Sequence, residues 1–112
     1  MTKLIKIIFL SYFSLFFHAV NAEEKIKIGL LVPMSGDNKE IGESIIKAVG
    51  LAVKDIDNDL IEIFPKDTAT KANQTLKSAF ELSQMGIKVV IGPVFYESLT
   101  YLDEMKDLTF LS

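Results

Sequence analysis

From residue 26 onward, the chain alternates short apolar runs with longer stretches whose apolar residues recur every three or four positions. Four apolar runs have the length of strands and are bounded by turn formers: 26–32, 60–65, 87–91 and 109–112. Three stretches between them have a helical period: 41 to about 57, about 71 to 86, and 98 to about 105. Strands that alternate with helices are typical of βαβ units and a parallel sheet. We therefore predict an α/β fold with helices on both faces of a parallel sheet.

The apolar positions also predict which side chains face the sheet. The first helix should turn inward Ile41, Ile45, Ala48, Val49, Ala52, Val53 and Ile56. The second helix should turn inward Ala72, Leu76, Ala79, Phe80 and Leu82. The residues 67–70 offer N-caps for this second helix, and Gly86 is expected to end it. The strands are apolar at nearly every position, which indicates burial on both faces.

The first 22 residues have a different pattern. Lys3 and Lys6 precede an apolar run over 7–17, and Ala22 closes a small-residue motif that fits a signal-peptidase site. An uncleaved anchor is the alternative, but the run is shorter than the ~20 residues that span a bilayer. No Cys stands at the cut, so no residue could carry a lipid. We predict a cleaved signal peptide over 1–22 and a periplasmic, non-lipidated product over 23–112.

The composition of that product excludes several kinds of chemistry. Without residues 1–22 it has 10 Lys, 15 acids and no Arg, His or Cys, which is a net charge of −5. Histidine-based triads, thiol nucleophiles, His/Cys metal sites and disulfides are therefore excluded. A net acidic chain without a basic patch also makes nucleic acid an unexpected partner.

The sequence motifs point to no catalytic or metal site either. The acidic run 55–59 imitates the start of a calcium-binding loop, but Leu60 and Lys66 stand where that loop needs Gly and Glu. No phosphate-binding Gly-rich loop and no nucleophile elbow occurs in the sequence. We expect no catalytic residue, no metal and no cofactor. An enzyme that uses two carboxylates as acid and base is retained only as a third hypothesis.

The predicted topology places a candidate ligand site. If the strand order is 2-1-3-4, the winding direction reverses between the first and third strands, and ligands bind at the carboxyl ends of the strands at such a point. The loops there contain Ser35–Gly36 and Tyr96–Glu97–Ser98, and both lead into helix N-termini that suit an anionic group. Alternatively, Ser35, Asp37 and Ser98 only cap helices, or Ser35 and Gly36 only form a turn.

The end of the predicted sheet indicates whether residues 23–112 form a complete domain. The fourth predicted strand, 109–112, has no helix behind it. A half-sheet of three or four strands would leave one face partly bare and one edge open. We expect residues 23–112 to be an incomplete N-terminal lobe of a longer protein.

Several blocks of the sequence resemble one family. They are the strand and loop 28–36, Gly42 with the helix end 51–57, Lys66–Thr68 with Ala72, and 89–93. Their order and spacing resemble the type I periplasmic solute-binding proteins, and in particular the leucine/isoleucine/valine-binding receptors of ABC transporters. The resemblance covers nearly all of 26–112, which corresponds to the first quarter to third of a family member.

The resemblance implies two α/β lobes that close on a small ligand such as an amino acid, and a receptor that hands it to an ABC permease. It places ligand contacts at Phe95, Tyr96, Glu97 and Ser98. Here the family's short Ser/Thr run is replaced by Phe95–Tyr96 and Glu97, and Ile41 stands where an aromatic residue is frequent. Penicillin-binding-protein activators, which regulate cell-wall synthases, have a similar fold and are the alternative reading.

Overall fold

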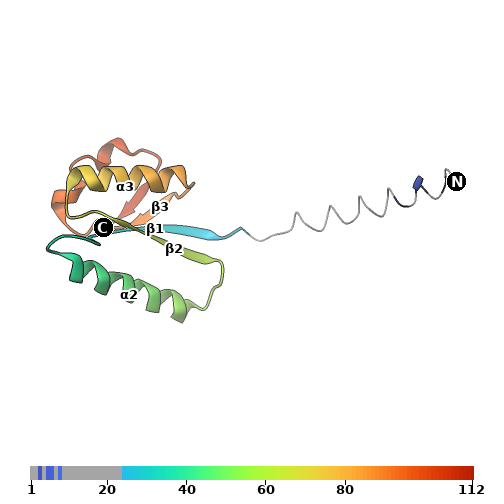
Figure 1. Ribbon diagram of the computed structural model, residues 1–112, viewed down its shortest axis with the longest axis horizontal. Coiled ribbons are helices and arrows are strands. Elements are labelled where there is room, and N and C mark those ends of the chain that lie inside the picture. Colours follow the sequence, from blue (N-terminus) through green and yellow to red (C-terminus); the bar gives the residue numbers. More distant parts are fainter. Residues whose placement is uncertain (1–2, 4, 7, 9–23) are drawn as a thin grey trace.

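The computed structural model describes residues 3, 5–6, 8 and 24–112, so the expected signal peptide over 1–22 lies almost entirely outside the described residues. The main elements, in chain order, are β1 (Ile26–Val32), α2 (Lys39–Ile56), β2 (Ile61–Asp67), α3 (Ala72–Gln84), β3 (Val89–Ile91), the 3-10 helices η2 (Tyr96–Leu99) and η3 (Leu102–Glu104), and β4 (Thr109–Leu111). The four strands form one parallel sheet in the order β2-β1-β3-β4 (Figure 1). The predicted α/β fold is confirmed, and the strand order is the one that the candidate site requires. Within the described part of the chain, every helix is too short or too polar to span a bilayer.

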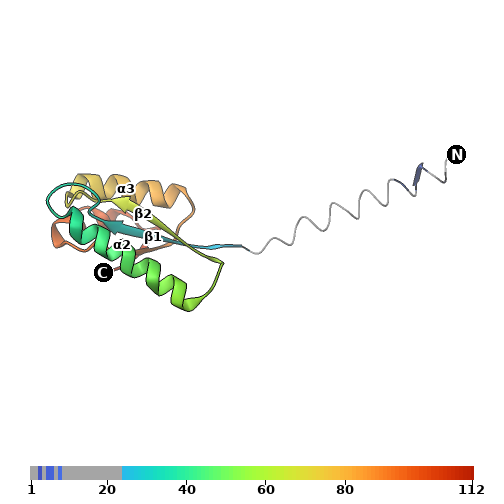
Figure 2. The same ribbon diagram turned by 60° about the horizontal axis from the view of Figure 1, so that its bottom comes forward.

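The strand register assigns side chains to the two faces of the sheet. Gly29 pairs with Val90, which pairs with Phe110, and the next row joins Leu30 to Ile91 and Leu111. Because consecutive residues of a strand point to opposite faces, the two rows face opposite sides. The first row faces α3, and the second row faces α2 (Figures 1 and 2). We call these sides the α3 face and the α2 face.

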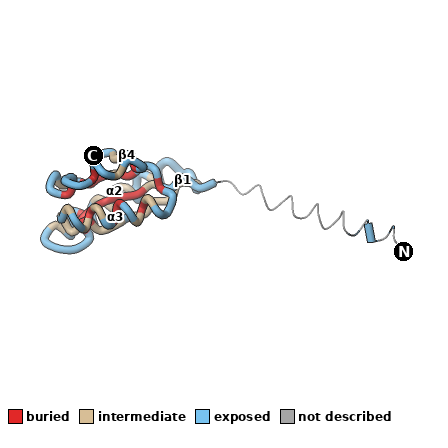
Figure 3. The backbone as a smooth tube through the Cα atoms, turned by 90° about the horizontal axis from the view of Figure 1, so that it is seen from above, coloured by how far each residue is buried: buried red, intermediate tan, exposed pale blue. Residues whose placement is uncertain are grey.

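The hydrophobic core lies on the α3 face. Its buried members are Leu31, Ala79, Leu82, Ile87, Val90, Leu102 and Leu108, and Phe64, Met105 and Phe110 pack against them. Gly29 makes room for this packing, since a Cβ there would lie 2.8 Å from a methyl carbon of Leu82. Figure 3 shows the buried segments gathered in the interior of the lobe, between exposed loops at its two ends.

Helix α2 is less buried than its pattern predicts. Gly42 is its only buried residue, whereas Ile41 and Ile56 are 45% and 60% exposed. Ala48 and Ala52 are also exposed, so the prediction that these four residues face the sheet was wrong. The reason is that α2 contacts mainly β1 and β2, so only part of its apolar stripe meets the sheet.

In α3, the prediction for Phe80 was also wrong, because its side chain is 53% exposed. The positions that α3 buries are Thr75, Ser78, Ala79 and Leu82. Thr75 and Ser78 can be buried because their hydroxyls donate to the backbone carbonyls of Lys71 and Asp67. A hydrophobicity pattern does not predict the burial of polar side chains that are hydrogen-bonded in this way.

Several elements differ from the predictions, and β3 begins at Val89 and not at 87. Strand β2 continues through Pro65 to Asp67, because it is an edge strand and a Pro there costs no hydrogen bond if its nitrogen faces away from β1. The helix predicted over 98–105 is instead the two short 3-10 helices η2 and η3. Between Pro93 and Leu108 the only buried side chains are those of Ser98 and Leu102. So few anchors do not stabilise a continuous α-helix.

Candidate functional site

Two loops lie side by side in the topology at the carboxyl edge of the sheet. The loop 33–38 follows β1 and the loop 92–98 follows β3, and these strands are paired neighbours. The predicted reversal of winding direction between them is therefore present in the fold. The two loops nevertheless make contact with different partners.

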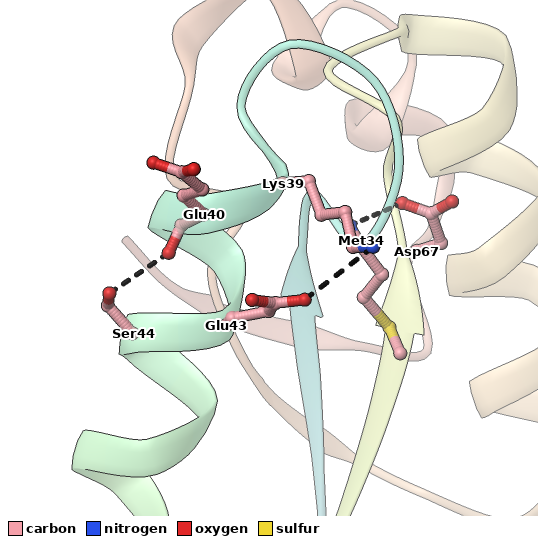
Figure 4. A network of polar contacts seen from close by, with 6 residues as sticks. All are labelled: Met34, Lys39, Glu40, Glu43, Ser44 and Asp67. Carbon is pink, nitrogen blue, oxygen red and sulfur yellow. Dashed lines mark hydrogen bonds and ion pairs between the residues drawn. The ribbon is translucent and has the colours of Figure 1, made fainter.

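The loop after β1 is held by Asp67, the last residue of β2 (Figure 4). One carboxylate oxygen, Oδ1, accepts hydrogen bonds from the Met34 N–H at 2.7 Å and the Ala69 N–H at 2.8 Å. The other, Oδ2, accepts from the Ser35 hydroxyl at 2.6 Å. The Asn38 amide also donates to the Thr70 hydroxyl at 3.1 Å. The loop 33–38 is thus tied to the loop 67–70, and these bonds do not involve the loop 92–98.

The electrostatics of Asp67 follow from these bonds. Burial alone would raise the pKa of the Asp67 carboxyl, but the hydrogen bonds from Ser35, Met34 and Ala69 favour the ionised form and outweigh burial. The pKa of Asp67 therefore lies below its ordinary value, and the side chain is a carboxylate at neutral pH.

The positive end of α2 is partly occupied by its own chain. The N-cap residue is Asn38 and it makes no side-chain cap, so the alternative readings of Ser35 and Asp37 as caps of this helix were wrong. The Lys39 N–H donates to the Gly36 carbonyl, and the Ile41 N–H donates to that of Asn38. Figure 4 shows the neighbouring contacts on the helix surface, where Lys39 approaches Glu43 at 3.8 Å.

Gly42 explains how closely α2 approaches the loop. A Cβ at this position would overlap the carbonyl oxygen of Pro33. The Gly that the resemblance singled out near the helix start therefore has a steric role: it lets α2 lie against the end of β1.

The loop after β3 forms the rim of an apolar hollow of about 390 Å³ on the α2 face. Its lining includes Leu30, Ile45, Ile91, Tyr96, Leu99 and Leu111. The Tyr96 side chain is 78% exposed at its edge. Ser35 and Gly36 do not line this hollow.

The six predicted ligand-binding residues therefore occupy different surroundings. Ser35 and Gly36 are exposed beside Asp67 and Ala69, Tyr96 and Glu97 are exposed, and Phe95 is half-buried. Ser98 is only 1% exposed, and its hydroxyl has no hydrogen-bond partner. It lies inside η2, for which Phe95 is the N-cap, so the alternative reading of Ser98 as a cap was wrong.

The sequence analysis missed the role of Asp67. It assigned residues 67–70 to helix capping, but the N-cap of α3 is Lys71 and it forms no side-chain cap. Ala69 and Thr70 instead have φ values of 48° and 55°, in the left-handed region. The Ala69 N–H donates to the Asp67 carboxylate and the Thr70 N–H donates to the Thr68 hydroxyl, and these bonds support the turn. An Asp-Thr pair directly after a strand is the signal that could have indicated it.

No group of three His, Cys, Asp or Glu side chains within the described ranges is arranged to hold a metal ion. The polar features at the carboxyl edge are thus hydroxyls, carboxylates and backbone groups. Such groups can bind and orient a small polar molecule through hydrogen bonds.

Comparison with known proteins agrees with this architecture. The model of the periplasmic binding protein family matches residues 25–107, so the chain belongs to that family. Its fold is the N-terminal part of the type I periplasmic binding fold. The relatives described below are binding or regulatory proteins.

Three relatives illustrate the two kinds of protein that this chain resembles, regulators and solute-binding proteins. The penicillin-binding protein activator LpoA of Haemophilus ducreyi is 28% identical over 88 residues, which is 76% of this chain and 14% of that protein. The LpoA C-domain from Haemophilus influenzae, a regulator of PBP1A, has 25% identity and a TM-score of 0.63, over 75% of this chain and 26% of the domain. A solute-binding protein from Rhodopseudomonas palustris, in complex with 3,4-dihydroxybenzoic acid, has 26% identity and a TM-score of 0.68 over 79% and 26%. The chain thus spans about a quarter of the solved relatives and less of the curated one.

Proposed function

We propose that this chain is part of the ligand-binding lobe of an extracytoplasmic solute receptor that serves an ABC importer. The ligand is an amino acid or a similar small polar molecule. The observation that carries the proposal is the pair of loops at the carboxyl edge of β1 and β3, one rich in hydrogen-bonding groups and one bordering an apolar hollow. An apolar pocket beside a few convergent polar groups is typical of small-ligand sites.

The proposed contacts are Ser35, Gly36, Phe95, Tyr96, Glu97 and Ser98. Tyr96 and Glu97 are exposed at the loop after β3, where a ligand could reach them directly. Ser98 would need a shift of η2 to reach a ligand, because its side chain is covered. An unpaired buried hydroxyl is costly, and a ligand that paired with it would recover part of that cost.

The remaining parts of the proposal concern the whole protein. A signal peptide over 1–22 would export the chain to the periplasm without a lipid anchor. A second lobe would close over the ligand, and an ABC permease would receive it. Residues 23–112 alone offer one side of such a cleft, so we expect the isolated chain to bind a free amino acid only weakly.

A second candidate is an activator-like regulator of cell-wall synthesis. It is favoured by the similarity to LpoA, both in sequence and in fold. The bulky loop 92–98, in which Phe95 and Tyr96 replace the hydroxyl-rich run of the amino-acid receptors, is compatible with a cleft that holds no small ligand. Its partner would be a cell-wall synthase and not a permease.

One experiment separates the two functions. The ¹⁵N-labelled chain is titrated with leucine and, separately, with 3,4-dihydroxybenzoate, while its amide resonances are followed by NMR. A receptor predicts saturable shifts, with weak affinity, at both loops 33–38 and 92–98. Tight binding would contradict the expectation that one lobe cannot enclose a ligand. The absence of shifts at both loops, together with binding of a purified class A cell-wall synthase to the chain, would favour the activator.

A further inference from the structure

We propose that Asp67 is a positioning residue that makes the Ser35 hydroxyl a hydrogen-bond acceptor, so that the loop 33–38 receives an ammonium or another N–H donor of a ligand and not its carboxylate. This inference rests on the proposed receptor function. It reverses the preference for an anion that the helix N-terminus alone would suggest.

The numbers of donors and acceptors on Ser35 and Asp67 determine the direction of their hydrogen bond. A serine hydroxyl has one hydrogen to donate and two lone pairs that accept, whereas an ionised carboxylate only accepts. The Ser35–Asp67 contact of 2.6 Å must therefore use the single hydrogen of Ser35. The lone pairs of the exposed Ser35 oxygen are left, and they can meet only a donor.

Backbone hydrogen bonds fix which carboxylate oxygen of Asp67 faces Ser35. Oδ1 of Asp67 receives two N–H groups, from Met34 and Ala69, and this fixes the rotation of the carboxylate so that Oδ2 faces Ser35. The lowered pKa of Asp67 keeps the group ionised at neutral pH, so it has no proton to donate in return.

The charges around the loop favour the same kind of ligand group. Asp37 lies in the loop, Glu40 follows it in the first turn of α2 and Asp67 binds it, while Lys39 is paired with Glu43. The first N–H groups of α2 are also partly used, because those of Lys39 and Ile41 donate to carbonyls within the loop. A carboxylate would therefore meet acids and few free donors, whereas an ammonium would meet an acceptor and negative charge.

The substitution Asp67→Asn tests the inference because it should reverse the hydrogen-bond direction. The two backbone N–H groups select the amide oxygen for the Oδ1 position. The amide NH₂ then faces Ser35 and donates to it, which frees the Ser35 hydrogen for a ligand. A purely structural role of Asp67 would weaken all binding but would not change which probe is preferred.

The probes are isoamylammonium and 4-methylpentanoate, which share a branched chain and differ in the charged end. Amide shifts of residues 33–38 are followed in the whole labelled chain. The native protein should prefer the ammonium probe, and Asp67→Asn should move the preference toward the carboxylate probe. Ser35→Ala keeps the two backbone bonds to Asp67 and should weaken the ammonium probe about threefold to tenfold, as one net hydrogen bond would.

Asp37→Asn is the matched control, since it removes the same charge from an exposed acid of the same loop. It should reduce the preference for the ammonium probe slightly, by the lost charge alone, and much less than Asp67→Asn does. A native preference for the carboxylate probe, or an unchanged preference in Asp67→Asn, would overturn the inference. Shifts at 92–98 but none at 33–38 would overturn it as well, while leaving the receptor function standing. The absence of shifts at both loops would count against the receptor function itself.

Discussion

The two faces of the sheet differ in how completely they are covered. On the α3 face, the helix α3, the 3-10 helix η3 and the sheet contribute to a continuous buried cluster that includes Leu82 and Val90. On the α2 face, a single helix lies over β1 and β2, while Ile91 and Leu111 line an open hollow next to it. An α-helix is about 10 Å wide and strands are about 4.8 Å apart, so one helix covers roughly two strands. The α2 face therefore has one helix where four strands need two.

Because of this difference, one face contributes mainly to stability and the other borders the candidate site. The α3 face supplies most of the buried apolar area, and so most of the hydrophobic stabilisation. The α2 face carries the exposed Ile41 and Leu111 and the rim of the candidate site, including Tyr96. Substitutions should therefore act very differently on the two faces. Four comparisons follow, from the largest expected effect to the smallest; the first and the last contrast the two faces, and the other two test contacts at the carboxyl edge of the sheet.

The largest contrast is between two leucines. Leu82 is fully buried on the α3 face, and Leu111 is 55% exposed on the α2 face. Leu82→Ala should lower the free energy of unfolding by about 2–5 kcal/mol, because it removes buried methyl groups and leaves a cavity. Leu111→Ala should cost less than about 1 kcal/mol. Urea unfolding followed by circular dichroism measures both, and losses of similar size would contradict the difference between the faces.

The second comparison concerns two glycines of α2. Gly42→Ala should destabilise the chain, by about 1–3 kcal/mol for an overpacked site, because its Cβ would overlap the Pro33 carbonyl. Gly50→Ala meets no atom within 4 Å and should stabilise the helix by up to about 1 kcal/mol. Thermal unfolding of the two variants should move in opposite directions. A shared direction would mean that α2 does not hold its close contact with the end of β1.

The third comparison uses pH to measure how much the contact between the loops 33–38 and 67–70 stabilises the folded chain. The pKa of Asp67 is lower in the folded chain than in the unfolded chain, so its contribution to stability is present above the unfolded value of about 3.9. That contribution is lost as the pH falls through the folded value. At pH 7, Asp67→Asn should cost about 1 kcal/mol, since the group is partly in contact with water.

This gap between the native chain and Asp67→Asn should shrink below about pH 4. Asp37→Asn, which alters an exposed acid of the same loop, is the control and should leave the pH dependence nearly unchanged. A gap that stayed constant down to pH 2 would show that Asp67 does not hold the loop through its charge.

The smallest effect on stability is expected from polar substitutions of exposed residues. Leu111 and Phe80 are 55% and 53% exposed, but only Leu111 borders the hollow. Leu111→Lys should reduce the fluorescence of the apolar dye ANS more than Phe80→Lys does, because the dye binds extended apolar surface. Both should change the free energy of unfolding by less than about 0.5 kcal/mol. Equal loss of dye binding in the two variants would contradict the location of the open surface.

Much of the fold follows from the hydrophobic pattern, and some of it does not. Strands β1 and β4 and helix α2 lie where the pattern predicted them, because long periodic runs and turn formers specify an element locally. The segment 98–105 does not form the predicted helix, because its conformation depends on how many of its side chains are buried in the core. The exposure of Ile41 and Phe80 likewise depends on how many neighbours the sheet provides.

The candidate site was likewise predictable from the sequence only in part. The sequence by itself determined the alternation of strands and helices and hence a parallel sheet, whereas the strand order, on which the place of the two loops depends, was only assumed until the structure gave it. Handed crossovers and apolar periods leave few topologies open but do not select one strand order. Only the tertiary structure decided that Asp67 binds Ser35 across 32 positions of sequence, and that Ser98 is buried and unpaired. Such contacts depend on the register of β2 against β1 and on side-chain packing, which no local pattern encodes.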